Sequence, residues 1–173
     1  KLEYMNQILS DLYVRDSVTG LYNRMGYQKL SISYFTIMRE KKMPVLVMFI
    51  DLDRLKYIND TFGHEYGDFA IISIAKAMLK HCDADAIAAR TGGDEFIVLE
   101  GAKDEESGRV LAQKIRTELS KTQRAMQLPF DLSASIGAVV AHPGEENVLE
   151  SYVKRAEMLM YEEKAEKKVS RDS

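Results

Sequence analysis

The chain has little of what stabilises secreted or membrane proteins. Its 173 residues include one cysteine, Cys82, which excludes an internal disulfide framework and suits a reducing compartment. The longest apolar runs, Pro44 to Ile50 and Phe69 to Ala75, are too short to cross a bilayer, and no signal-peptide pattern opens the chain. We therefore expect a cytoplasmic location without membrane contact by this segment, although a longer protein could be anchored through an upstream region.

A large excess of one charge is also missing. The 24 basic and 27 acidic residues give a formal net charge of −3, which disfavours a nucleic-acid polymer as partner. Between Glu150 and Ser173 six basic residues balance six acidic ones, so charge alone indicates a solvated amphipathic helix there. The 46% hydrophobic content is enough for one core, and no repeat or low-complexity linker marks a domain boundary.

The most informative segment that is present is the short acidic turn Arg90 to Phe96. It places two glycines and the acids Asp94 and Glu95 between two apolar runs, Ala86 to Ala89 and Phe96 to Leu99. This pattern predicts a β-hairpin whose glycines supply positive φ angles and leave the loop bare for a ligand. A solvated surface hairpin has the same pattern, so the turn alone does not identify a site.

A second acidic group follows the apolar run Pro44 to Ile50, which is typical of a buried strand and ends in Asp51-Leu52-Asp53. Burying unpaired charge costs several kcal/mol, so carboxylates at a strand end usually face a cation or a donor. If the hairpin pairs beside this strand, Asp51 and Asp94, which have no other evident partner, can share one hard cation such as Mg²⁺ carrying substrate phosphates. The alternative is that Asp51 caps a turn or the following helix.

Periodicity and turn residues predict the remaining elements. Helices are expected over Leu2 to Val14, Arg24 to Glu40, Tyr66 to His81, Glu105 to Thr122 and Asn147 to Lys168, and strands over Pro44 to Ile50, Ala86 to Thr91, Glu95 to Glu100 and Asp131 to Val140. Asn59 is expected in a loop. The order β, α, β, β, α, β with adjacent antiparallel strands indicates an α+β fold of the ferredoxin-like type, flanked by extra helices.

Three blocks of the chain, Asp16 to Arg24, Phe49 to Asp68 and Arg90 to Phe96, resemble in order and separation the signature blocks of the GGDEF domain of diguanylate cyclases. The resemblance extends to about Lys168. It implies an antiparallel sheet flanked by helices, related to nucleotidyl cyclases and polymerase palms, over residues 16–173. Residues 1–15, which carry leucines at coiled-coil spacing and do not begin with Met, would be the end of a signalling helix from an upstream sensory domain.

The resemblance also implies a reaction. Two GTP condense to cyclic di-GMP with release of pyrophosphate, each protomer of a homodimer holding one GTP. The cofactor is Mg²⁺ or Mn²⁺, and Asp51, Asp94 and the backbone carbonyl of Leu52 match its ligands. Glu95 matches the acceptor of the 3′-hydroxyl proton and a further metal ligand. A carboxylate can do this because metal binding lowers the pKa of the hydroxyl.

The remaining matched positions contact the substrate. Lys56 would stabilise charge on the phosphates in the transition state, and further positions match substrate-binding residues: Asn59, His64, Asp68, Lys164 and Lys168. Asn59 and Asp68 would read guanine. A carboxylate accepts the N1 and N2 hydrogens that adenine cannot offer, which favours GTP over ATP. Taken singly, these lysines would be surface charges, His64 a loop residue and Asn59 a turn or cap residue.

The chain departs from the family at several positions. The Arg-x-x-Asp product-inhibition motif is replaced by Asp83 and Ala86, so cyclic di-GMP is not expected to inhibit there. Thr91 replaces the usual aromatic residue before the glycines. Lys168 replaces the usual arginine, and a lysine cannot make the bidentate contact to phosphate that an arginine makes. The alternatives are a catalytically silent GGDEF domain that binds GTP and regulates a neighbouring domain, and a structural α/β module with an acidic hairpin.

Overall fold

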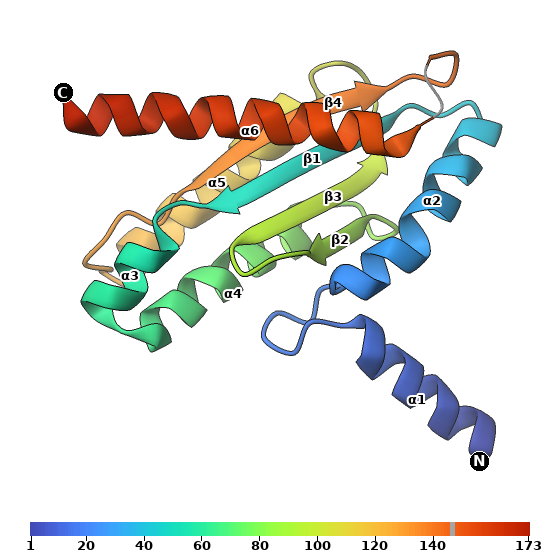
Figure 1. Cartoon of the computed structure of the whole chain (residues 1–173), viewed down its shortest axis with the longest axis horizontal. Coiled ribbons are helices and arrows are strands. Elements are labelled where there is room, and N and C mark those ends of the chain that lie inside the picture. The colour runs from blue at the N-terminus through green and yellow to red at the C-terminus, as the bar shows by residue number, and fades with distance from the viewer. Residues whose placement is uncertain (146–147) are drawn as a thin grey trace.

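In the computed structural model, residues 1–145 and 148–173 are described, and they form a four-stranded antiparallel sheet with helices on both faces (Figure 1). The strands are β1 (Val45–Leu52), β2 (Ile87–Arg90), β3 (Glu95–Gly101) and β4 (Ala134–Ala141), in the order β2-β3-β1-β4. The helices are α1 (Leu2–Val14), α2 (Arg24–Glu40), α3 (Leu55–Phe62), α4 (His64–His81), α5 (Ser107–Ala125) and α6 (Leu149–Asp172). The predicted α+β, ferredoxin-like fold is confirmed.

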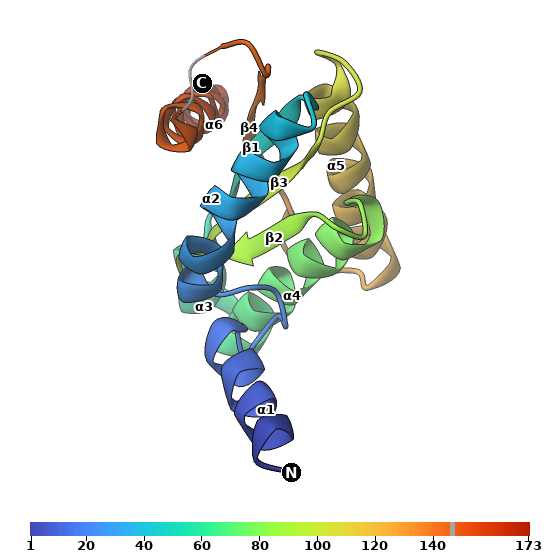
Figure 2. The same cartoon turned by 90° about the vertical axis from the view of Figure 1, so that its right-hand side faces the viewer.

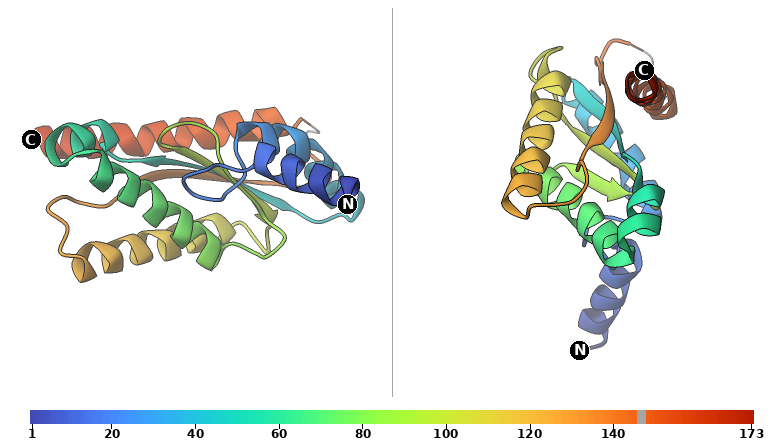
Figure 3. Two further views of the ribbon diagram at one scale, coloured as in Figure 1. Left: turned by 90° about the horizontal axis from the view of Figure 1, so that it is seen from below. Right: turned by 90° about the vertical axis from the view of Figure 1, so that its left-hand side faces the viewer.

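The central strand β1 is buried on both faces of the sheet. Alternate residues such as Leu46 and Met48 pack with α4 and α5, whereas Val47 and Phe49 belong to the core beneath α2 and α6. Figures 2 and 3 show the sheet between these two helical layers. Burial on both sides explains why this strand is one continuous apolar run in the sequence.

Helix α6 packs closely on β4. A Cβ atom at Gly137 would lie 1.9 Å from the backbone carbonyl of Ala156, so only glycine lets the helix approach so closely. Tyr152 and Met160 on α6 are buried in the same layer. The balanced charge of this segment therefore describes its outer face only, because its inner face belongs to the core. The predicted start of this helix at Asn147 lies outside the described residues.

The predicted bounds of α5 and β4 differ from the observed ones by one to three residues, and the region of α3 and α4 was predicted wrongly in more detail. Asn59 lies in the helix α3 and not in a loop, and α4 starts at His64, two residues before the predicted Tyr66. Arg54 adopts a left-handed conformation (φ 59°) that turns the chain from β1 into α3, and Gly63 (φ 99°) turns it from α3 into α4. Only Gly63 separates the two helices, so the polar residues at the end of α3 and the start of α4 form one continuous polar segment, which was interpreted as a loop.

Helix α1 projects away from the sheet and approaches α2 (Figure 1). Its apolar residues Leu2, Leu9 and Leu12 are all exposed. Among the described helices, none is both long enough and apolar enough to span a membrane.

The close contact between α6 and β4 predicts the effect of one substitution. Gly137→Ala should lower the free energy of unfolding by about 1–3 kcal/mol, because the new methyl group meets backbone that cannot move without shifting α6. Gly144→Ala is the matched control, since a Cβ there meets nothing within 4 Å. Urea denaturation measures both variants, and an equal loss in the two would contradict the packing argument.

Candidate active site

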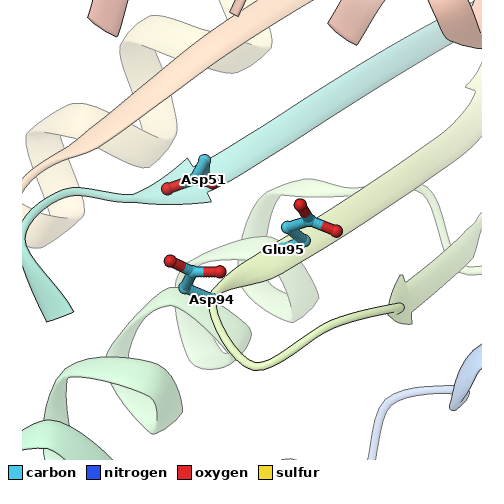
Figure 4. A group of neighbouring side chains, drawn as sticks. All are labelled: Asp51, Asp94 and Glu95. Atoms are coloured by element: carbon cyan, nitrogen blue, oxygen red, sulfur yellow. The ribbon is translucent and has the colours of Figure 1, made fainter. Parts of the chain in front are cut away.

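The sheet register brings the end of β1 to the tip of the β2–β3 hairpin. Asp51 pairs with Glu95, and the amide of Leu52 donates to the carbonyl of Asp94 at 2.8 Å. One carboxylate oxygen from each of Asp51, Asp94 and Glu95 lies within 4.8 Å of the others (Figure 4). Ligands on opposite sides of one Mg²⁺ are roughly 4.2 Å apart, so the spacing of these oxygens is close to what a shared ion requires. The acids predicted to bind metal therefore do converge.

Asp51 is buried, and it has a partner that the sequence did not indicate. Nζ of Lys164 on α6 donates to its Oδ1 at 2.5 Å, so the expectation that this acid lacked another partner is wrong. Burial, with Asp94 and Glu95 nearby, nevertheless raises the pKa of Asp51 to about 6. Burial alone would lower the pKa of Lys164, but its bond to Asp51 and the surrounding acids outweigh this and raise it. One ammonium does not balance three carboxylates, and the remaining negative charge favours a cation.

Glu95 occupies the first position of β3, against the hairpin loop. Burial and the negative charges of Asp94 and Glu157 raise its pKa, which makes this carboxylate a better proton acceptor. A Cβ at Gly92 would lie 2.9 Å from Oε2 of Glu95, whereas one at Gly93 would meet nothing within 4 Å. Gly93 thus leaves its part of the loop open, as predicted, whereas the space beside Gly92 is filled by the side chain of Glu95.

The predicted positive φ angles of these two glycines are not found. Among the described glycines only Gly20 and Gly63 have positive φ. The reason is the length of the connection, because four residues, 91–94, join β2 to β3. A two-residue hairpin turn demands left-handed residues, and this longer connection does not.

Arg90, to which the sequence assigned no role, holds the hairpin tip. Its Nε and Nη2 donate to the carbonyl of Gly93 at 3.1 and 2.8 Å, and its Nη1 lies 3.3 Å from both carboxylate oxygens of Asp16. Burial raises the pKa of Asp16, but hydrogen bonds from Thr19 and the charge of Arg90 outweigh it and lower the pKa. The occurrence of Asp16 and Arg90 at the starts of two motif blocks was the available signal for this pair.

Asp53 was also left without a role, and it joins three elements. Its carboxylate accepts hydrogen bonds from Ser133 and Ser135 at 2.7 Å and from Nζ of Lys167 at 2.8 Å. Burial alone would raise the pKa of Asp53, but the hydrogen bonds from these three donors have the larger effect, and the pKa lies below its ordinary value. Lys167 also donates to the carbonyl of Ala134, which ties α6 to the sheet. The neighbouring Lys168, predicted to bind phosphate, is exposed.

The predicted substrate-binding residues of the second block gather where α3 meets α4. Asn59 packs so closely on Gly67 that a Cβ there would lie 1.7 Å from its Oδ1. His64 begins α4, Asp68 follows one turn later, and Lys56 lies in the first turn of α3. In the described part of the chain, no hydrogen bond or ion pair engages the exposed side chains of Lys56, His64 and Asp68, so a ligand can reach them.

Comparisons with known proteins identify the family. The model for "Diguanylate cyclase, GGDEF domain" matches residues 13–170. Diguanylate cyclase VdcA from Vibrio cholerae is 34% identical over 153 residues, which is 86% of this chain and 43% of that protein. The cyclic di-GMP phosphodiesterase PdeR from Escherichia coli is 32% identical, over 84% of this chain and 22% of that protein. The chain thus spans less than half the length of either relative.

Solved structures share the fold. The coiled coil and GGDEF domain of DgcB from Caulobacter crescentus, in complex with c-di-GMP, superposes with a TM-score of 0.78 at 23% identity, over 95% of this chain and 87% of that one. A microbial GGDEF domain with bound cyclic di-GMP gives a TM-score of 0.75 at 27% identity, over 91% and 94%. Because the family model matches residues 13–170 and the acidic turn lies at the end of β1, this chain belongs to the GGDEF domain family.

Proposed function

We propose that this chain is a diguanylate cyclase that condenses two GTP to cyclic di-GMP and pyrophosphate with Mg²⁺ or Mn²⁺. The convergence of Asp51, Asp94 and Glu95 beside the loop that Gly93 leaves open carries the proposal. Oxygen donors of this kind suit a hard divalent cation. Phosphoryl transfer asks the protein mainly to position in-line groups and neutralise charge, and an acidic cluster at an open sheet end suits that task.

Each acid has a distinct role in this reaction. Asp51, Asp94 and the carbonyl of Leu52 would hold the metal, with Glu95 beside them. When bound, the ion neutralises phosphate charge and lowers the pKa of a coordinated hydroxyl. Glu95 accepts the proton of the 3′-hydroxyl as that oxygen attacks the α-phosphate of the second GTP, and its raised pKa favours the transfer.

The substrate is held by residues around these acids. Lys56, Lys164 and Lys168 place positive charge near the phosphates. Asn59 and Asp68, brought together at the junction of α3 and α4, contact the guanine edge, and His64 supplies a further substrate contact at the start of α4.

Catalysis requires a homodimer in which two half-sites face each other, because each protomer holds one GTP. The exposed leucines of α1 are suited to helix pairing, and residues 1–15 would then transmit the state of an upstream sensory domain. We place the reaction in the cytoplasm. At the position of the inhibitory motif, Asp83 stands where the arginine would be, and its backbone amide donates to the buried carboxylate of Glu100. The negative charges of these two residues disfavour the binding of a phosphate-rich product there.

The alternative is a silent domain that binds GTP and regulates a neighbour. It deserves a direct test because relatives named for making and for degrading cyclic di-GMP both match this chain. The presence of both acids of the turn favours the active enzyme. Incubation with GTP and Mg²⁺, followed by mass spectrometry, should yield cyclic di-GMP and pyrophosphate, and bound but unconverted GTP would favour the silent domain.

Glu95→Gln tests the proton acceptor. The amide keeps the size of the side chain and removes its charge, so GTP should still bind while turnover falls by roughly a hundredfold or more. Glu162→Gln, the same exchange at an exposed position of α6, should leave turnover unchanged. A Glu95→Gln enzyme with full turnover would exclude this role.

Asp68→Asn tests base recognition. The amide presents a donor where guanine offers hydrogens, so GTP binding should weaken by about 1–3 kcal/mol and the preference over ATP should narrow. Glu65→Gln, also at the start of α4, is the control. Titrations of both nucleotides measure the ratio of affinities, and an unchanged ratio would show that Asp68 does not contact the base.

The raised pKa of Asp51 predicts how metal binding depends on pH. Its folded-state pKa of about 6 lies above the ordinary value, so the metal-free protein gains stability as the pH falls through 6 and the carboxyl takes up a proton. The same proton competes with the metal. The rise in Tm that Mn²⁺ produces at neutral pH should therefore disappear below about pH 6. Asp51→Asn should show no such rise, and a metal effect that persists at about pH 5 would contradict the assignment.

A further inference from the structure

Lys164 binds the carboxylate that a metal ion would need. Its Nζ contacts Oδ1 of Asp51, and Asp51 belongs to the three-acid cluster. We propose that Lys164 is an exchangeable occupant of the metal site: it holds Asp51 in the metal-free protein and moves to the phosphates when a divalent cation and a nucleoside triphosphate enter together. This inference rests on the proposed metal site and adds an order of events to it.

The helix that carries Lys164 does not depend on this bond. One turn away, Lys167 donates to Asp53 and to the carbonyl of Ala134. On the preceding residue, Glu163 forms an ion pair with Arg116 at 2.7 Å and accepts the amide of Ile136 at 2.9 Å. Helix α6 therefore stays docked if Lys164 releases Asp51, and the movement is confined to one side chain.

The Lys164 side chain is free to make that movement. It is 37% exposed, whereas the Asp51 side chain is 6% exposed. In the described part of the chain, Asp51 is its one hydrogen-bonding partner. Four rotatable methylene groups let the ammonium reach a new anion while the backbone stays in place.

The charges give a reason for the exchange. Three carboxylates and one ammonium leave an excess of two negative charges, so the lysine is attracted to the empty cluster. A divalent cation that takes Oδ1 of Asp51 as a ligand competes with the ammonium for that oxygen, and two cations on one carboxylate oxygen repel each other. The phosphates of the nucleotide then provide the nearest negative charge. A metal ion arriving alone must displace Lys164 without this compensation.

Metal and nucleotide should consequently bind cooperatively. The metal alone binds weakly, the nucleotide strengthens metal binding, and by linkage the metal strengthens nucleotide binding by the same factor. Part of this coupling comes from metal–phosphate bonds in any nucleotide enzyme. The part assigned to Lys164 is the part that disappears when its charge is removed.

The test is a Mn²⁺ titration followed by the EPR signal of the free ion, with and without a GTP analogue whose α,β-bridge is a methylene group and cannot react. Lys164→Met keeps the length of the side chain and removes its charge. It should bind Mn²⁺ alone at least about fivefold more tightly than the wild type, and the strengthening by the analogue should shrink at least about fivefold. Lys164→Gln should change both quantities in the same direction, should the methionine variant not fold.

Lys154→Met is the matched control, because it removes the same charge from an exposed position of α6 that has no part in the proposed site. It should change the affinity for Mn²⁺ alone by less than about twofold, since a screened surface charge contributes little. If Lys164→Met binds Mn²⁺ alone no more tightly than wild type or this control, the exchange is wrong and the metal site stands. If no variant binds Mn²⁺ with or without the analogue, both the metal site and the exchange are wrong.

Discussion

The interior strand β1 is apolar on both faces until the chain reaches the carboxylates of Asp51 and Asp53. The rest of the site supplies hydrogen-bond donors to these two buried charges. Asp51 and Asp53 are 4% and 5% exposed, so water does not solvate them. Burial of such charges without partners would cost several kcal/mol, so the protein must supply donors. They are the hydroxyls of Ser133, just before β4, and of Ser135 on β4, together with the ammonium groups of Lys164 and Lys167 on α6.

The sheet topology decides which further groups reach this point. With the order β2-β3-β1-β4, the end of β1 lies between the hairpin tip and the start of β4. The register opposite Glu95 then brings the two hairpin acids to Asp51, and the bond between Leu52 and Asp94 continues the pairing past the strand. Arg90 fixes the loop from the other side through Gly93. The backbone of each acid is thus held in place by hydrogen bonds before any ligand arrives, so only the side chains have to adjust.

Sequence reasoning predicted what depends on local patterns. The helices Leu2–Val14 and Arg24–Glu40 match their predicted bounds, and the acidic hairpin and central strand were found because their apolar periodicity is continuous. Helix α3 was missed because its eight residues include Asn59-Asp60, which resemble a turn. The partner of Asp51 was missed for a different reason. Lys164 lies 113 residues further along the chain, and no local pattern specifies such a contact.

The choice between neighbouring lysines shows how packing sets chemistry. Lys167 and Lys168 are adjacent, but successive residues of a helix point about 100° apart, so one docked helix can direct only one of them at the sheet. The close approach of α6 at Gly137 fixes that rotation, and Lys167 reaches Asp53 while Lys168 stays exposed. The sequence motif indicates only that this turn of the helix is rich in lysine. The packing of the helix decides that Lys167, and not Lys168, contacts Asp53.

Asp51 and Asp53 differ in a way that separates a binding residue from a structural one. They are two residues apart, at the end of β1 and in the turn that follows it, and they are similarly buried, yet the pKa of Asp53 is lowered and that of Asp51 is raised. Asp53 accepts hydrogen bonds from Ser133, Ser135 and Lys167, which satisfy its charge. Asp51 has one donor and two acidic neighbours. A buried carboxylate whose charge the fold leaves unsatisfied is therefore the one that can gain from a cation, and this difference favours Asp51 over Asp53 as the metal ligand.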